Sequence, residues 1–359
     1  MADFIKDIFE QATKLAASDI HIHSDQKPAI RIDGRLYILD DFPVITHQHL
    51  DNYIQKMLRP DQIESFSVVH QVDTSLEYTE LGVLRVHIYR QRGKLAMANR
   101  IIGSKIPDIK DLGLPPLVQK LCHQQRGLVL VAGATSNGKS TTLAAIIEQI
   151  NKLYARHILT IEDPIEFIFE NQKSVFSQRD IGIDTTSFSA SIVAAMREDP
   201  DVILISDLRD NESIENALTA AETGHLVFAT THAPTAPDAI TRLLATFPAE
   251  KQDSIRIKLA QNLRAVVAQR LIPKAGKIGR ILACEYMLMS SRIKELMLDP
   301  LKVGDISILL QGDNITKGVL SFDAHMAHLV TKGQIDADTA MEFATSPTDM
   351  KLKLSGMMN

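Results

Sequence analysis

The chain has 359 residues, of which 45% are hydrophobic and 23% are charged. This is the composition of a globular protein, and the length suffices for two or three domains. The net charge of −5 argues against a protein held to nucleic acid by bulk positive charge. No apolar run reaches the roughly 18 residues of a membrane span, and the start lacks the features of a secretory signal. We therefore expect a cytoplasmic protein with no transmembrane segment.

The first 102 residues predict a small α+β domain. Apolar residues fall on one helical face over residues 4–16, and residues 19–23 alternate as a strand does. Asp33-Gly34, between alternating runs at 29–32 and 36–39, predicts a hairpin turn because glycine accepts a positive φ. Periodicity assigns the remaining segments of this region: a helix over 48–58 and strands over 69–76, 83–89 and 95–102.

The pattern changes after a Pro- and Gly-containing segment at 103–116, which predicts a linker. Residues 127–132 form a continuous apolar run, typical of a parallel strand buried on both faces. A glycine-containing loop and a helix over 139–153 follow. Further buried strands are expected over 157–161, 202–205 and 226–230. This alternation predicts a doubly wound parallel sheet over 117–290, with a helical region over 291–359.

The segment GATSNGKS at residues 133–140 matches G-x-x-x-x-G-K-[ST] between a strand and a helix. Backbone N–H groups of such a loop bind phosphate, Lys139 can reach the β- and γ-phosphates, and Ser140 can bind Mg²⁺. We therefore expect ATP and Mg²⁺ as cofactors. The candidate nucleotide-binding residues here are Gly133, Ala134, Thr135, Ser136, Asn137, Gly138, Lys139, Ser140 and Thr141.

Acidic residues follow two of the expected strands. Asp207 stands after 202–205, where a Walker-B carboxylate would bind Mg²⁺ directly or through water. Glu162, Asp163 and Glu166 follow 157–161, and one of them can polarise an attacking water as a general base. For each of them the alternative is a solvated loop carboxylate.

Two histidines bracket the strand over 226–230. His232 stands at its carboxyl end, on the edge where α/β sheets bind ligands, and could contact the γ-phosphate. His225 stands at the opposite end, where a structural or interface role is expected.

These motifs occur in one order along nearly the whole chain. They include GLVLVAGATSNGKSTTLAA, HILTIEDPIEFIFE, MREDPDVILISDLRD, LTAAETGHLVFATTH and, nearer the start, RVHIYRQRGKLAMANRII. The chain thereby resembles twitching-motility ATPases of the PilT/PilU type, within the secretion ATPase superfamily. The resemblance implies a PAS-like domain over 1–102 and a RecA-like ATPase domain over 117–290.

The resemblance also implies an oligomeric assembly and its partners. It implies a homo-hexameric ring that binds ATP between its two domains and powers type IV pilus retraction. The ring would act at the cytoplasmic face of the inner membrane, on a pilus platform protein and beside a paralogous motor ATPase.

The family's functional residues carry over by position. Glu166 matches the catalytic base, Lys139 and Ser140 match the Walker-A pair, and His225 and His232 match the histidine box. Three arginines of the N-terminal domain match positions that can approach phosphates, a task that suits the planar, permanently charged guanidinium: Arg85, Arg92 and Arg100.

The sequence departs from the family pattern in three places. Asp207 replaces a glutamate, which draws the carboxylate back by about 1.5 Å, one C–C bond. Ser136 replaces a glycine, and a positive φ there would strain the loop. Residues 306–312, ISILLQG, lack the arginine of the family's retraction motif.

Three functions are therefore weighed. The first is an ATP-hydrolysing motor for pilus retraction or a related secretion machine. The second is an accessory ring subunit that binds ATP with weak or no hydrolysis of its own, which Asp207 favours. The third is a RecA-like nucleic-acid motor, which the acidic net charge and the absence of a basic, aromatic-containing binding loop oppose.

Overall fold

The structure, a computed structural model, describes residues 4–15, 17–32, 35–78, 82–102, 106–276, 279–312 and 318–357. By its internal contacts the chain divides into two compact units. The first comprises Met1–Lys105 and the short segment Glu166–Ile168, and the second comprises Ile106–Ile165 and Phe169–Asn359.

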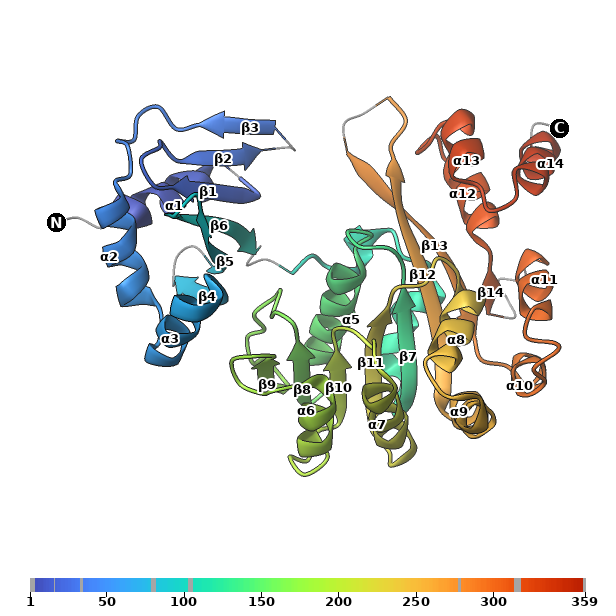
Figure 1. Cartoon of the computed structure of the whole chain (residues 1–359). Coiled ribbons are helices and arrows are strands. Elements are labelled where there is room, and N and C mark those ends of the chain that lie inside the picture. Colours follow the sequence, from blue (N-terminus) through green and yellow to red (C-terminus); the bar gives the residue numbers. More distant parts are fainter. Residues whose placement is uncertain are drawn as a thin grey trace. The chain divides into compact units, whose positions relative to one another are not determined.

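The first unit holds an antiparallel sheet and the helices that pack on it (Figure 1). Its strands lie in the order β3-β2-β1-β6-β5-β4. Their bounds are β1 Asp19–His23, β2 Ala29–Ile32, β3 Arg35–Ile38, β4 Gln71–Tyr78, β5 Gly82–Gln91 and β6 Lys94–Ile102. The helices are α1 Phe4–Lys14, α2 His47–Met57 and α3 Pro60–Val69. The predicted β2–β3 hairpin is confirmed by the pairing of Ile32 with Arg35, while its Asp33-Gly34 turn lies outside the described residues.

One face of this sheet forms the core of the first unit. Ile20 and Ile22 of β1 are buried together with Ile8 and Phe9 of α1, as the period of two in the strand and the helical spacing in α1 require. The alternate positions of the strands lie on the other face of the sheet.

The second unit is built on a sheet of order β14-β13-β12-β7-β11-β10-β8-β9. The strands from β12 to β9 in that order are parallel, whereas β13 and β14 are antiparallel additions. Their bounds are β7 Gly127–Ala132, β8 His157–Glu162, β9 Val175–Asp180, β10 Val202–Ile205, β11 Leu226–Thr231, β12 Leu263–Pro273, β13 Arg280–Leu288 and β14 Val319–Leu320. The predicted α/β fold with an N-terminal α+β domain is confirmed.

The connections of the parallel strands place helices on both faces. The β7–α5–β8 crossover runs toward β9, and the β10–α7–β11 crossover runs toward β14. Because such crossovers are right-handed, α5 and α7 cover opposite faces. Because β7, β8, β10 and β11 are parallel, their carboxyl ends lie at one edge of the sheet. The helices of the second unit that precede β12 in the chain are α4 Pro116–Gln119, α5 Lys139–Leu153, α6 Phe188–Ala195, α7 Asn211–Glu222, α8 Ala236–Ala245 and α9 Ala249–Asn262. Two 3₁₀ turns, Ile109–Leu112 and Lys120–His123, lie in the same part of the chain.

The residues after β13 are mostly helical, as expected, and share the core of the second unit. Met297, Phe322 and Met326 pack in one cluster with Val266 of β12 and Met287 of β13. The helices are α10 Ser291–Leu298, α11 Asp305–Gln311, α12 Phe322–Thr331, α13 Ala337–Phe343 and α14 Pro347–Met357. Among the described residues, no helix combines the length and apolar character that crossing a membrane requires.

Candidate nucleotide site

The loop between β7 and α5 has the backbone of a phosphate-binding loop. Gly133 has a φ of 151°, and a Cβ at that position would lie 2.8 Å from the backbone oxygen of Gln269. Gly138 caps α5 with a φ of 81°. Ser136, which replaces a glycine of the family, has a φ of 64°. The positive φ that was expected to strain a serine is therefore present.

Lys139 begins α5 and lies over this loop. Its Nζ donates to the backbone oxygens of Gly133 at 2.9 Å and Ala134 at 3.0 Å, and the side chain is only 9% exposed. Its ammonium thus stands beside the loop whose N–H groups would bind phosphate.

Strand β12 braces the loop and the start of α5. Asn137 Oδ1 accepts a hydrogen bond from the Leu271 backbone N–H at 3.3 Å. Gln269 Nε2 donates to Thr142 Oγ1 at 2.8 Å. This bracing role of Gln269 and Leu271 had no signal in the sequence, because the two segments are more than one hundred residues apart.

A buried carboxylate lies at the carboxyl end of the neighbouring strands β10 and β11. Asp207 follows β10 and is 5% exposed. Its Oδ2 accepts from Arg209 Nε at 2.5 Å and is 2.9 Å from His232 Nε2. The hydrogen bond to Asp207 raises the pKa of Arg209. The structure thus brings together two predicted residues, Asp207 and His232, and adds Arg209.

The two oxygens of Asp207 differ. Oδ2 has both hydrogen bonds, whereas Oδ1 is buried without a hydrogen-bond partner among the residues that the structure describes. A buried carboxylate oxygen without a partner is costly, and a hard cation or its bound water would satisfy it. With the Ser140 hydroxyl, the oxygen ligands present suit Mg²⁺.

After the hydrogen bond to Asp207, the charge of Asp163 also raises the pKa of Arg209, so one acidic residue after β8 acts on this cluster. Glu162 ends β8, is 6% exposed and accepts from Gln178 Nε2 of β9 at 3.5 Å. Asp163 and Glu166 are exposed. By its contacts Glu166 belongs to the first unit, and its role as catalytic base stays a prediction.

His225 lies at the amino end of β11, and its Nδ1 is 2.9 Å from the backbone oxygen of Ala220. The structure does not bring it to the edge that carries His232. The structural or interface role expected from the strand pattern and the binding role implied by the resemblance both stay predictions.

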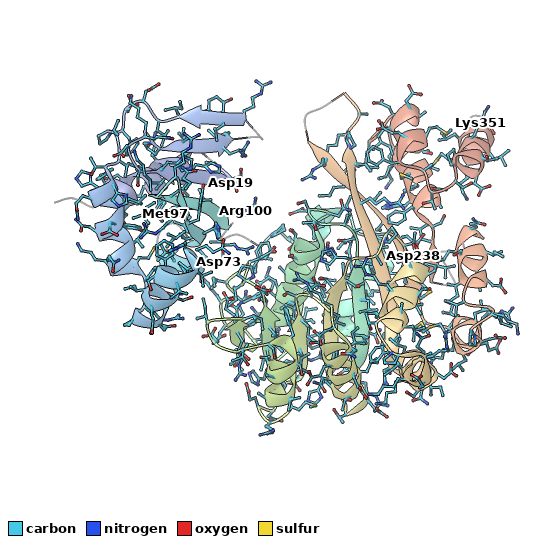
Figure 2. The ribbon with its side chains drawn as sticks, in the orientation of Figure 1. Asp19, Asp73, Met97, Arg100, Asp238 and Lys351 are labelled. Atoms are coloured by element: carbon cyan, nitrogen blue, oxygen red, sulfur yellow. The ribbon has the colours of Figure 1, made fainter. Side chains whose placement is uncertain are left out.

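The three candidate arginines of the first unit lie on two strands of its sheet and in the turn between them. Arg85 of β5 and Arg100 of β6 are directly opposite each other and exposed. Arg100 Nε donates to Asp19 Oδ1 at 3.0 Å (Figure 2). Arg92, in the β5–β6 turn, is exposed with a φ of 51°. All three are available to an outside partner, and their contact with phosphate stays a prediction.

A cavity of about 640 Å³ adjoins the first turn of α5. Gly138 lines it from the phosphate-binding loop and Thr141 from the first turn of α5. Among the residues that the structure describes, three cationic side chains, Lys274, Arg280 and Lys332, line it beside one acidic side chain, Asp111. An excess of positive charge next to the loop favours an anionic ligand.

A phosphate-binding loop at the carboxyl edge of a parallel sheet, with a buried carboxylate after a neighbouring strand, defines a P-loop nucleoside triphosphatase. Residues 103–301 match the family described as "Type II/IV secretion system protein". The chain belongs to this family, and within it to the ATPases that PilT and PilU represent.

Three relatives support this assignment. The type IV pilus retraction ATPase PilT of Pseudomonas aeruginosa is 37% identical over 96% of this chain and 98% of its own length. The type IV pilus ATPase PilU of the same organism is 34% identical, over 96% and 91%. The crystal structure of the pilus retraction motor PilT with bound ADP superposes with a TM-score of 0.89 at 39% identity, covering 96% and 98% of the two chains.

Proposed function

We propose that this protein hydrolyses ATP to drive retraction of a type IV pilus or a related pilus or secretion machine. The observation that carries the proposal is the pairing of the Gly133–Ser140 loop with the buried Asp207 at one edge of the sheet. The similarity of the chain to the retraction ATPase PilT and the type IV pilus ATPase PilU supports the same function.

The residues divide the task between binding and chemistry. The loop N–H groups and Lys139 would bind the β- and γ-phosphates, since two loop carbonyls already hold the ammonium in place. Glu166 would take a proton from the attacking water. His232 would contact the γ-phosphate while it orients Asp207.

Ser140 and the free oxygen of Asp207 would hold Mg²⁺. When bound, the ion would neutralise charge on the phosphate oxygens. Arg209 and His232 contribute by binding the other oxygen of Asp207, which fixes the direction of the free one.

The proposed assembly is a homo-hexamer at the cytoplasmic face of the inner membrane. There it would engage a pilus platform protein and, in the manner of paired motors, a paralogous ATPase. Nucleic acid is not among the proposed partners, because the net charge is −5. Arg85, Arg92 and Arg100 would approach the phosphates of a bound nucleotide.

Steady-state ATP hydrolysis by the purified full chain with Mg²⁺ tests the proposal, beside Lys139→Ala and Glu166→Gln. We expect turnover in the wild type, loss of nucleotide binding in Lys139→Ala, and binding without turnover in Glu166→Gln. Wild-type turnover in Lys139→Ala would refute the site. Equal loss of binding in Glu166→Gln would make Glu166 a structural residue.

The alternative is an accessory ring subunit that binds ATP and assists a stronger motor. Asp207 favours it, because the carboxylate is shorter than the family's glutamate. Tight ATP binding without wild-type turnover would support this alternative over the motor.

A further inference from the structure

The loop that carries His232 into the site is held by helix α8, which follows it directly. Strand β11 ends at Thr231, His232 begins the loop that turns the chain, and α8 begins at Ala236. Thr235 caps the helix by accepting from the Asp238 N–H at 3.2 Å. Asp238 marks this first turn in Figure 2. The position of His232 therefore depends on where α8 lies.

Arg242 connects the helix back to the histidine. From the second turn of α8, Arg242 Nη1 donates to the backbone oxygen of His232 at 2.5 Å. The guanidinium of Arg242 thus joins two points of the chain that are ten residues apart. His232 is held on both sides, since its imidazole Nε2 lies 2.9 Å from Asp207 Oδ2.

The start of α8 is fixed independently from the sheet. The Ala236 N–H donates to Glu285 Oε1 of β13 at 2.8 Å. Glu285 is 5% exposed, so this carboxylate is a rigid acceptor at the positive end of the helix dipole. A contact chain therefore runs from Glu285 through α8 and Arg242 to His232 and Asp207.

We propose that Arg242 is a positioning residue for the Asp207–His232 pair, and that Glu285 anchors the helix that carries it. Arg242 acts through a backbone carbonyl and does not touch the nucleotide. The proposal rests on the proposed ATPase function. Because misplacement of about 1 Å at a reacting centre costs about 100-fold in rate, losing this contact should reduce kcat while phosphate binding at Gly133–Ser140 persists.

The main test is Arg242→Ala in the full chain, since this side chain is exposed and its removal leaves no core cavity. We expect kcat for ATP hydrolysis to fall at least ten-fold, with KM, nucleotide affinity and melting temperature close to those of the wild type. Arg242→Lys should recover part of the loss, because an ammonium can donate to the same carbonyl. Thr241→Ala, one position away on the same exposed surface, is the matched control.

Glu285 is tested by a pair of variants. Glu285→Gln keeps an oxygen that accepts from Ala236 N–H and should retain kcat. Glu285→Ala removes it and should lower kcat beyond any change in nucleotide affinity. Unchanged kcat in Arg242→Ala would overturn the proposal, as would a loss equal to that of Thr241→Ala. If the wild type itself showed no turnover, the proposed function and not the positioning role would have failed.

Discussion

Asp207 has one oxygen with two hydrogen-bond partners, and within the described part of the chain its other oxygen has none. Its Oδ2 lies at hydrogen-bond distance from both Arg209 and His232. The site is therefore built for a side chain of aspartate length. A glutamate would move the carboxylate outward by about 1.5 Å in a buried position, away from both partners.

Asp207→Glu is thus predicted to lower kcat about ten-fold or more, since the displaced carboxylate would lose both contacts. The measurement is steady-state ATP hydrolysis with nucleotide affinity determined in parallel. A rise in turnover would mean instead that the short acid limits the rate, and would favour the accessory-subunit alternative.

Gly133 is a second position where one added atom, a Cβ, would disturb the phosphate-binding loop. A Cβ there would lie 2.8 Å from the backbone oxygen of Gln269, and the φ of 151° disfavours other residues. Gly133→Ala is predicted to lower the melting temperature and abolish nucleotide binding. The matched variant is Gly182→Ala, which has a φ of 86° and open space around the new Cβ.

Gly182→Ala should lose about 1 kcal/mol through backbone strain alone, or about 3 °C in melting temperature for a domain of this size, with nucleotide binding intact. If both variants melted alike and both bound nucleotide, the close approach of Gln269 would have no consequence for the loop.

The sequence predicted the residues of the site better than the contacts between them. Lys139, Asp207 and His232 were found because each follows a buried strand, and the carboxyl ends of parallel strands share an edge. Arg209 and Arg242 were assigned no role, because a guanidinium that binds a neighbouring side chain or carbonyl leaves no periodic signal.

At the scale of elements, continuous apolar runs predicted strands β7, β8, β10 and β11, all of which are buried on both faces. Strands β9, β12, β13 and β14 were missed. Strand β12 contains Gln269, which is buried through its bond to Thr142, and it follows α9 at Asn262 with no turn residue between them. Helix α3 was also missed, since its terminal Val68 and Val69 favour a strand by composition.

Strand β13 and helix α12 share a buried histidine. His325 Nδ1 accepts from the Cys284 N–H at 2.9 Å, and burial lowers the pKa of His325 from 6.5 to about 4. The folded state then binds the proton less readily than the unfolded state. Stability is full above about pH 6.5 and is lost as pH falls toward 4.

His325→Asn is predicted to weaken this acid-induced loss, because the asparagine oxygen accepts the same hydrogen bond and does not titrate. A pKa difference of this size corresponds to about 3 kcal/mol. The measurement is melting temperature between pH 4 and 7.

Glu285, the next residue after Cys284, provides the control of opposite sign. Burial raises its pKa from 4.5 to about 7, so the folded state binds its proton more readily and stability is lost as pH rises through this window. Glu285→Gln should therefore reduce the loss of melting temperature near pH 7 and leave the loss toward pH 4 unchanged. If His325→Asn left the loss toward pH 4 unchanged, that loss would belong to other groups.

For the whole molecule, the central question is whether the first unit contributes to ATP hydrolysis in the second. Arg85 is exposed on the sheet of the first unit and makes no ion pair or hydrogen bond within the described parts of the chain. Arg100, opposite it, is already paired with Asp19. Of this opposite pair, Arg85 is thus the arginine whose charge is available to a nucleotide at the lower cost.

Arg85→Ala is predicted to lower kcat or raise KM for ATP by about ten-fold or more, because an arginine on a phosphoryl group stabilises charge that no other group replaces. The melting temperature should not change, since the side chain is exposed and unpaired. The control is Arg35→Ala, an exposed arginine of β3 on the same sheet, which removes the same charge from the same unit. Equal kinetics in the two variants would mean that the first unit affects hydrolysis through its net charge alone. Loss confined to Arg85→Ala would place a specific cation of the first unit at the nucleotide.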